Sequence, residues 1–260
     1  DATNVLTLAT TYTDTAGNAP ASTSTTDNYT VDTTAATVVA FTLSDSALKI
    51  GDTATVTLQF SEAVTGFSSD ADVTVQNGSL ATMTSSDNIT WTGTFTPSSD
   101  VEDATNVMSL ATSYTDTAGN AGPSATTDNY EVDTIRPTVA AFTMSDTALI
   151  SGETSTVTLQ FSEAVASFSS DDDITVQNGS LATMTSSDNI TWTGTFTPTS
   201  DVEDATNVLT LATTYTDTAG NAPASTSVSD NYEIDTIAPT MTITSSTVSD
   251  GSTSSDPAIT

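Results

Sequence analysis

The sequence contains no cysteine and no histidine, and its 260 residues include only two basic side chains, Lys49 and Arg136. Without cysteine, the chain cannot form disulfides, thiolate zinc sites or a thiol nucleophile. Without histidine, it lacks the usual general base near neutral pH and the imidazole metal ligand. These absences exclude several common kinds of active site and metal centre.

Positive charge and long apolar segments are equally scarce. The two basic residues stand against 33 acidic ones, which gives a formal net charge of -31. Nucleic acids and anionic membrane surfaces attract lysine and arginine, so we expect neither as a partner. No run of 18 apolar residues exists, so we expect no direct membrane insertion of this segment.

A polar chain with so much charge can be disordered, and apolar residues make up only 36% of this one. The apolar residues nevertheless alternate with threonine and serine, and tryptophan and tyrosine recur at fixed places. This order along the sequence favours a folded chain with a repeated core.

The clearest feature that is present is an internal repeat. The stretch Tyr-Glu-Val-Asp-Thr-Ile-Arg-Pro-Thr at residues 130–138 has counterparts at 29–37 and 232–240, and their aspartates lie 101 and 102 residues apart. Residues 1–18 are identical to 204–221 at all 18 positions. A fixed period of this length indicates tandem modules that each form one structural unit.

The repeat boundaries divide the chain into four parts. We expect 1–30 to be the C-terminal part of a preceding module, 31–132 and 133–234 to be complete modules, and 235–260 to begin a following, divergent one. The chain thus begins in mid-repeat and is expected to be an excerpt. An aspartate followed by proline predicts a stiff hinge between modules. Ala36 replaces the proline of the other two hinges and is expected to loosen the first.

Each period shows alternation of apolar and polar residues, with turn signals every 8–12 residues. We expect seven strands in the first complete module, at 37–43, 53–60, 72–76, 80–84, 89–96, 107–114 and 127–132. Abundant threonine and valine with period-2 alternation favours a two-sheet antiparallel β-sandwich, and no window has sustained helical periodicity. The predicted class is all-β, with sandwich modules of about 101 residues arranged end to end.

Alternating strand directions bring acidic loops together at the module junctions. Carboxylates about 4 Å apart repel by ~1 kcal/mol even in water, so the loops must either separate or share a hard cation. Calcium accepts six to eight oxygen ligands in flexible geometry. The candidate ligands are Asp32, Glu62, Asp70, Asp72, Asp103, Asp116, Asp133, Glu163, Asp171, Asp173, Asp204, Asp217 and Asp235. The alternative is that these acids are solvated loop residues that serve solubility.

Several motifs together carry a resemblance to a known family. They are Phe-Ser-Glu-Ala-Val from residue 60, Tyr-Thr-Asp-Thr-Ala-Gly-Asn from 114, Asp-Ile-Thr-Val-Gln-Asn-Gly from 173 and Asp-Thr-Ile-Ala-Pro-Thr from 235. This combination resembles the bacterial immunoglobulin-like repeats of giant surface adhesins, which are often type I-secreted. The resemblance implies immunoglobulin-like modules, an extracellular cell-surface location and a calcium-stiffened extender whose partners are neighbouring modules.

Three functional interpretations fit the sequence. The first is a structural stalk or filament segment. The second is a module that binds glycans or ice through a threonine-rich face such as Thr90, Thr92 and Thr94, or a chain that associates laterally into a sheath. The third, an enzyme, is not expected, because the acids recur beside hinges and no aromatic subsites accompany them. Trp91 and Trp192 fit a core pattern better than a sugar-stacking platform. Asn88 and Asn189 begin glycosylation acceptor triplets.

Overall fold

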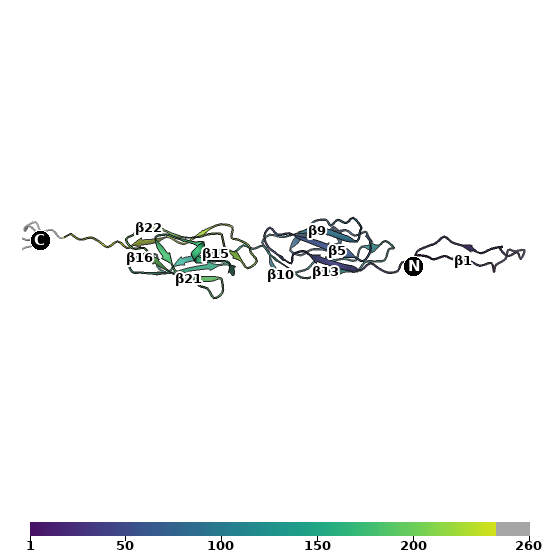
Figure 1. The fold of residues 1–260 in the computed structure, drawn as a ribbon, viewed down its shortest axis with the longest axis horizontal. Helices are drawn as coiled ribbons and strands as arrows, with labels where there is room; N and C mark the ends of the chain where they lie inside the picture. Colours follow the sequence, from purple (N-terminus) through teal and green to yellow (C-terminus); the bar gives the residue numbers. More distant parts are fainter. Residues whose placement is uncertain (243–260) are drawn as a thin grey trace, which may run out of the picture. The chain divides into compact units, whose positions relative to one another are not determined.

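The computed structural model describes residues 1–242. The chain forms two compact units, Asp1–Ile135 and a second that begins at Arg136, and Figure 1 shows the strands of both. The divergent repeat expected after residue 242 lies outside the described residues. Each unit is all-β apart from one helical turn within the described residues.

The first unit contains a sandwich and a separate hairpin. The hairpin pairs β1 (Thr7–Leu8) with β2 (Ser24–Thr25). One layer of the sandwich is a four-stranded sheet in the order β3 (Val38–Leu43), β5 (Ala54–Phe60), β9 (Thr90–Pro97) and β8 (Gly78–Leu80).

Shorter strands make up the rest of this sandwich. One group is β10 (Glu102–Asn106), β14 (Tyr130–Asp133) and β4 (Ala47–Leu48); a second is β13 (Ala125–Thr126), β11 (Ser109–Leu110) and β7 (Val73–Thr74); the third is β12 (Thr115–Asp116) with β6 (Val64–Thr65). A single helical turn, α1 (Ser69–Asp72), precedes β7.

The second unit repeats this arrangement strand for strand. Its four-stranded sheet is β15 (Val139–Met144), β17 (Ser155–Phe161), β21 (Thr191–Pro198) and β20 (Gly179–Leu181). Its shorter strands form three groups. They are β16 (Ala148–Ile150), β26 (Tyr232–Asp235) and β22 (Glu203–Asn207); β19 (Ile174–Val176), β23 (Leu209–Leu211) and β25 (Ser227–Val228); and β18 (Val165–Ala166) with β24 (Thr216–Asp217). The helical turn α2 (Ser170–Asp173) matches α1.

Two details differ from the expected antiparallel sandwich. β4 pairs with β14 in parallel, because the chain leaves β3 at a short turn and crosses to the opposite layer without reversing. The segment expected to be a strand from residue 72 is preceded by the helical turn α1, whose four residues are too few to produce a helical sequence pattern.

Alternation along the strands places the core between the layers. In β5, Ala54 and Val56 are buried while Thr55 between them is exposed. Phe60 packs on Tyr114 with ring centroids 5.0 Å apart, and aromatic contacts of this kind add to the hydrophobic stabilisation of a core. Trp91 is half-buried and packs edge-on against Phe67, at 4.9 Å, so it is part of the core and not an exposed platform.

Tyr114 also links two loops at one end of the module. Its hydroxyl donates a hydrogen bond of 2.7 Å to the carbonyl oxygen of Pro123. The ring lies so close to Gly122 that a Cβ at that position would come within 2.0 Å of it, so only glycine fits there. This contact orders the chain immediately before and after the loop that carries Asp116.

Candidate metal centre

The candidate centre is built on a loop of sequence Asp-Thr-Ala-Gly-Asn, which begins at Asp116, the last residue of β12. Asp116 Oδ1 accepts hydrogen bonds of 2.9 Å from the backbone amides of Ala118 and Asn120, and its Oδ2 accepts one of 2.8 Å from Asn120 Nδ2. Gly119 takes a φ of +96°, which a residue with a side chain would adopt only under strain. The loop therefore fixes the Asp116 carboxylate in one orientation.

Strand pairing brings a second acid to this loop. β6 and β12 are antiparallel, and Val64 lies opposite Asp116. Glu62 stands two residues before Val64, at the end of the turn that leaves the central strand β5. Because the pairing fixes these two segments side by side, Glu62 reaches the Asp116 carboxylate although 54 positions separate them in the sequence.

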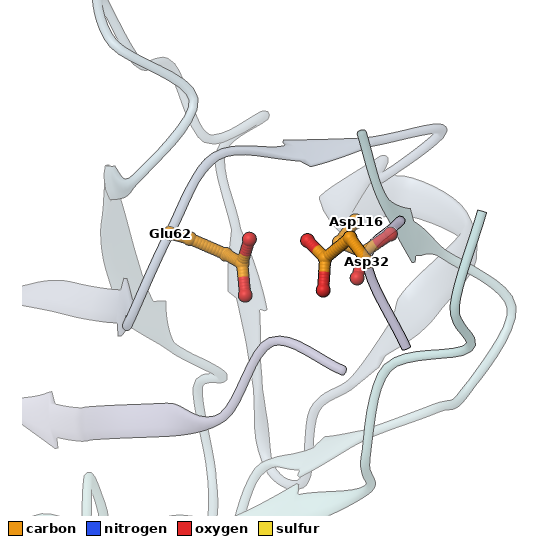
Figure 2. Close-up of side chains that lie close together, drawn as sticks. All are labelled: Asp32, Glu62 and Asp116. Atoms are coloured by element: carbon orange, nitrogen blue, oxygen red, sulfur yellow. The ribbon is translucent and has the colours of Figure 1, made fainter. Parts of the chain in front are cut away.

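The third acid, Asp32, arrives on the segment that leads into β3. That segment is held by hydrogen bonds between Thr37 and Ser61, one in each direction, at 2.9 Å. Asn120 Nδ2 also donates to the Asp32 carbonyl oxygen at 3.3 Å. Figure 2 shows the Glu62 carboxylate pointing toward those of Asp32 and Asp116. One carboxylate oxygen from each residue lies within 4.8 Å of the others.

The electrostatics of the triad are unbalanced. Asp116 is buried, Glu62 is half-buried and Asp32 is exposed. The hydrogen bond from the Asn120 side chain, helped by backbone amides of the loop, holds the pKa of Asp116 below its ordinary value although burial acts to raise it. Asp116 is thus anionic at neutral pH.

Neither basic side chain neutralises the triad. Lys49 pairs with Asp52 at 3.2 Å. Arg136 donates to the carbonyl oxygen of Ala222 at 2.6 Å. Three carboxylates converge here, and the partners of Lys49 and Arg136 are other groups.

The donor set indicates which metal fits. The triad offers carboxylate oxygens and neither nitrogen nor sulfur, which suits a hard divalent cation such as calcium and not zinc or copper. Three carboxylates supply up to about six of the six to eight oxygens that calcium takes, and backbone carbonyls or water can supply the remainder. The residues present therefore fit a calcium ion.

The same three acids recur in the sequence one period later, as Asp133, Glu163 and Asp217. In the second unit, Glu163 stands two residues before Val165, which lies opposite Asp217 in the pairing of β18 with β24. Asp217 is fully buried and accepts hydrogen bonds from the backbone and side chain of Asn221, at 2.8 and 2.9 Å.

Two pairs of the predicted ligands lie near α1 and α2 and are not members of the triads. Asp72 is buried, and its Oδ2 accepts a 2.8 Å hydrogen bond from the Ser68 amide while its Oδ1 accepts one from the Ser113 hydroxyl. Asp173 makes the equivalent bonds with Ser169 and Thr214. These carboxylates secure the helical turn.

Asp70 and Asp171 instead accept hydrogen bonds from a threonine across the loop, Thr82 and Thr183 respectively, at 2.9–3.1 Å. Both aspartates belong to the helical turns, and the structure uses them to hold the segment that follows β8 or β20.

The remaining predicted ligands stand at the other end of the strands. Asp103 and Asp204 accept hydrogen bonds from Asn77 and Asn178, at 2.8 and 2.9 Å. Asp235 ends β26 opposite Glu203 and accepts a 3.2 Å bond from the amide of Ile237. None of the three belongs to a triad in the described part of the chain.

Asn120 is a residue of the site that was not among the predicted ligands. It holds Asp116 through two hydrogen bonds and contacts the Asp32 backbone through a third. The signal was present in the sequence, because an asparagine follows the loop aspartate by four residues at Asn18, Asn120 and Asn221.

Comparison with known proteins places this geometry in a family. The family described as bacterial Ig-like domain matches residues 32–132 and again residues 133–234. The chain belongs to this family. The two matched Ig-like domains stand in tandem with a period of about 101 residues, which confirms the predicted all-β, immunoglobulin-like class.

Solved structures resemble the chain only in fold. An I-band fragment of titin has 9% identity and a TM-score of 0.41, and the match covers 79% of this chain and 66% of the fragment. An E-to-A mutated three-Ig titin variant has 11% identity, a TM-score of 0.42 and coverages of 78% and 65%. The chain thus spans slightly less than two thirds of these fragments.

A more distant likeness is SGBP-B of the Bacteroides ovatus mixed-linkage glucan utilization locus, solved with a mixed-linkage heptasaccharide. It has 15% identity and a TM-score of 0.19, with 84% of this chain and 50% of that one covered. A comparison with curated proteins gave no match. At these scores the likenesses carry no information about function.

Among the described residues, no helix has the length and apolar character needed to cross a membrane.

Proposed function

We propose that this chain is a spacer segment of a large bacterial cell-surface protein, an adhesin or a surface filament, and that calcium stiffens the junctions between its Ig-like modules. The observation that carries the proposal is the acidic triad of Asp32, Glu62 and Asp116, whose three acids recur in the sequence of the second module. The triad combines an aspartate from the linking segment with two acids from loops of the module that follows. A cation bound by all three would restrain the linker.

The rest of the chain supports a role in providing length. The modules match at 53 of 61 positions between residues 60–120 and 161–221, which is more similarity than a fold alone requires. A binding surface needs one specific site, whereas a spacer gains by adding equivalent units. The net charge of -31 keeps such units soluble and opposes their bundling, as expected for a protein exported to the cell surface.

A calcium titration of the full chain tests the proposal. We expect binding with a dissociation constant of about 0.1–1 mM, the range of extracellular modules. Glu62→Gln keeps the size of the side chain and removes one charged ligand, so affinity at the first triad should fall by about tenfold. Glu131→Gln is the matched control, since Glu131 is exposed on β14 and outside the triads.

The stiffening is tested separately from the binding. Small-angle scattering should give a larger and better-defined maximum dimension with millimolar calcium than with chelator, and Glu62→Gln with Glu163→Gln should remove the difference. Equal scattering in both conditions, with calcium bound, would leave a metal site that does not stiffen the chain. Unchanged affinity in Glu62→Gln would reject the triad as the site.

A second candidate function rests on one sheet face. Thr57 of β5 lies opposite Thr42 of β3 on one side and Thr92 of β9 on the other, and Thr55 lies opposite Thr94. Thr92 and Thr94 are exposed, so their hydroxyls form a regular array that could bind glycans or ice. Glycan arrays and ice-recrystallisation assays on the full chain, with light scattering for lateral association, separate this candidate from the spacer.

A further inference from the structure

Five Asn-x-Ser/Thr triplets occur in the chain, beginning at Asn28, Asn77, Asn88, Asn178 and Asn189. This triplet is the acceptor pattern for N-linked glycosylation. Transfer of a sugar requires the asparagine carboxamide to be accessible and free to react. The structure divides the five triplets into two groups by this criterion, which the sequence alone cannot do.

In three triplets the carboxamide is already occupied. Asn77 Nδ2 donates to Asp103 Oδ2 at 2.8 Å and to Asn106 Oδ1 at 2.6 Å, and Asn77 is half-buried. Asn178 repeats this arrangement at 2.9 and 2.7 Å. Asn28 donates to the Ala2 carbonyl oxygen at 2.9 Å and accepts from the Asn4 amide at 2.8 Å. Glycosylation of these side chains would break hydrogen bonds that join separate segments.

The other two triplets present the opposite picture. Asn88 and Asn189 are exposed at the turn before β9 and β21, with φ values of 56° and 58°. The side-chain amides of both make no hydrogen bond within residues 1–242, whereas the Asn88 carbonyl oxygen accepts the Val64 amide at 3.0 Å. The backbone is thus anchored to the module while the carboxamide is left to solvent.

The residues that follow Asn88 are fixed as well. Asp87 Oδ1 accepts the amides of Ile89 and Thr90, both at 2.9 Å, and Asp188 makes the same pair of bonds in the second module. Thr90 is half-buried, and its hydroxyl, the other recognised group of the triplet, makes no hydrogen bond within residues 1–242. Both groups that an acceptor needs are therefore unoccupied at the same turn of each module.

We propose that Asn88 and Asn189 are N-glycosylation sites, modified by a sequon-reading transferase that uses a sugar activated as a diphosphate. The Asn88 Nδ2 attacks C1 of the sugar, and the bond from C1 to the diphosphate oxygen breaks with its electron pair on the leaving diphosphate. One Nδ2 proton passes to a base of the transferase. The product carries one glycan at the equivalent turn of each of the two complete modules.

The test is in vitro glycosylation of the folded full chain, with site occupancy mapped by mass spectrometry after cleavage at acidic residues. One arm uses a nucleoside diphosphate hexose with a soluble transferase, and the other a lipid-linked diphosphate oligosaccharide with a membrane transferase. We expect modification of Asn88 and Asn189 in at least one arm. Asn28, Asn77 and Asn178 should stay at or near zero until the chain is unfolded in urea.

Two variants separate recognition from exposure. Thr90→Ser keeps the hydroxyl and should keep modification at Asn88, whereas Thr90→Val should abolish it and leave Asn189 modified as an internal control. A peptide spanning residues 87–91 verifies each transferase. The proposal is overturned if the folded chain stays unmodified at Asn88 and Asn189 in both arms, or if Asn77 and Asn178 are modified to the same extent in the folded state.

Discussion

The N-terminal hairpin of the first unit and the hairpin formed by residues 204–234 share their sequence but not their surroundings. Residues 1–18 are identical to 204–221. Both hairpins pair in the same register, with Leu8 opposite Ser24 and Leu211 opposite Ser227. In both, an asparagine side chain, Asn4 or Asn207, donates to the tyrosine carbonyl across the hairpin, at 3.2 or 3.1 Å.

Their apolar faces differ completely. Leu6 is 64% exposed and Tyr12 is 50% exposed, whereas the equivalent Leu209 and Tyr215 are 0% and 1% exposed. In the second unit Phe161 of the facing sheet packs on Tyr215, with centroids 4.9 Å apart. The hairpin geometry is thus encoded locally, through turns and side-chain hydrogen bonds. The core depends on the facing sheet, which residues 204–234 cannot provide alone.

The largest effect that should separate the two hairpins is removal of a leucine. Leu209→Ala should destabilise the second unit by about 2–5 kcal/mol, because it leaves a cavity in a packed core. Leu6→Ala makes the same change on an exposed face and should alter stability by less than about 0.5 kcal/mol. Urea unfolding followed by Trp192 fluorescence, in a Trp91→Phe background, measures the effect of Leu209→Ala. Equal effects would show that the N-terminal face is covered.

The strands that alternation predicted well are three of the four in the four-stranded sheet, whereas the strand expected at 80–84 is observed as Gly78–Leu80. The expected strand at 53–60 is observed as Ala54–Phe60, and that at 89–96 as Thr90–Pro97. Their alternating side chains face a core on one side only, so the period-2 pattern carries the information directly. Of the expected strand at 107–114, only Ser109–Leu110 is observed, as β11, and β10 ends before it at Asn106. Buried Asn106 bonds the Asp103 and Tyr130 carbonyls there and shifts the register, an effect with no apolar signature.

The sequence predicted which acids gather at one end of the module, but not which of them form the triad. Strand direction places Glu62 and Asp116 at one end of the module, because both follow strands that run the same way. The sequence could not separate these acids from Asp72, which lies at the same end. Only the structure shows that Asp72 is committed to Ser68 and Ser113. Hydrogen bonds of single side chains depend on distances of a few tenths of an ångström, which strand patterns do not contain.

A smaller effect should come from the tyrosine hydroxyls of the two environments. Tyr114→Phe removes the bond to the Pro123 carbonyl and should cost the first unit about 0.5–1.5 kcal/mol. Tyr12→Phe, at the equivalent position of the exposed hairpin, should leave stability unchanged within about 0.5 kcal/mol. Trp91 fluorescence during urea unfolding, in a Trp192→Phe background, measures both. A Tyr12→Phe loss as large as that of Tyr114→Phe would mean that the hairpin hydroxyl has a partner.

Burial also raises the pKa of Tyr114 to about 12, with a lesser contribution from the charge of Asp72. The unfolded chain therefore loses this proton before the folded one does, and the contribution of Tyr114 to stability is lost as pH rises from about 10 toward 12. Tyr114→Phe should accordingly show a weaker loss of stability over this pH range than the parent chain. Parallel losses in the two proteins would contradict the assignment.

The smallest expected difference in stability concerns the loops that carry Asp116 and Asp14. The two aspartates accept the same set of hydrogen bonds. The pKa of Asp116 is lowered mainly by the Asn120 side chain, and that of Asp14 mainly by the Asn18 backbone. A folded-state pKa below the unfolded value of about 3.9 gives stability that is present above that pH and is lost as pH falls through the folded-state pKa. Asp116→Asn should thus be less stable than the parent at pH 7, and the gap should close as pH falls below about 4.

Asp14→Asn removes the same hydrogen bonds from a loop whose hairpin is not packed on the sandwich. Unfolding of the first unit, followed by Trp91 fluorescence in the Trp192→Phe background, should therefore match the parent at every pH. If the hydrogen-bonded carboxylate causes the difference in stability between Asp116→Asn and the parent, that difference must depend on pH. A constant gap would instead assign the loss to side-chain packing in the loop, and a matching gap in Asp14→Asn would show that the N-terminal loop contributes to the sandwich after all.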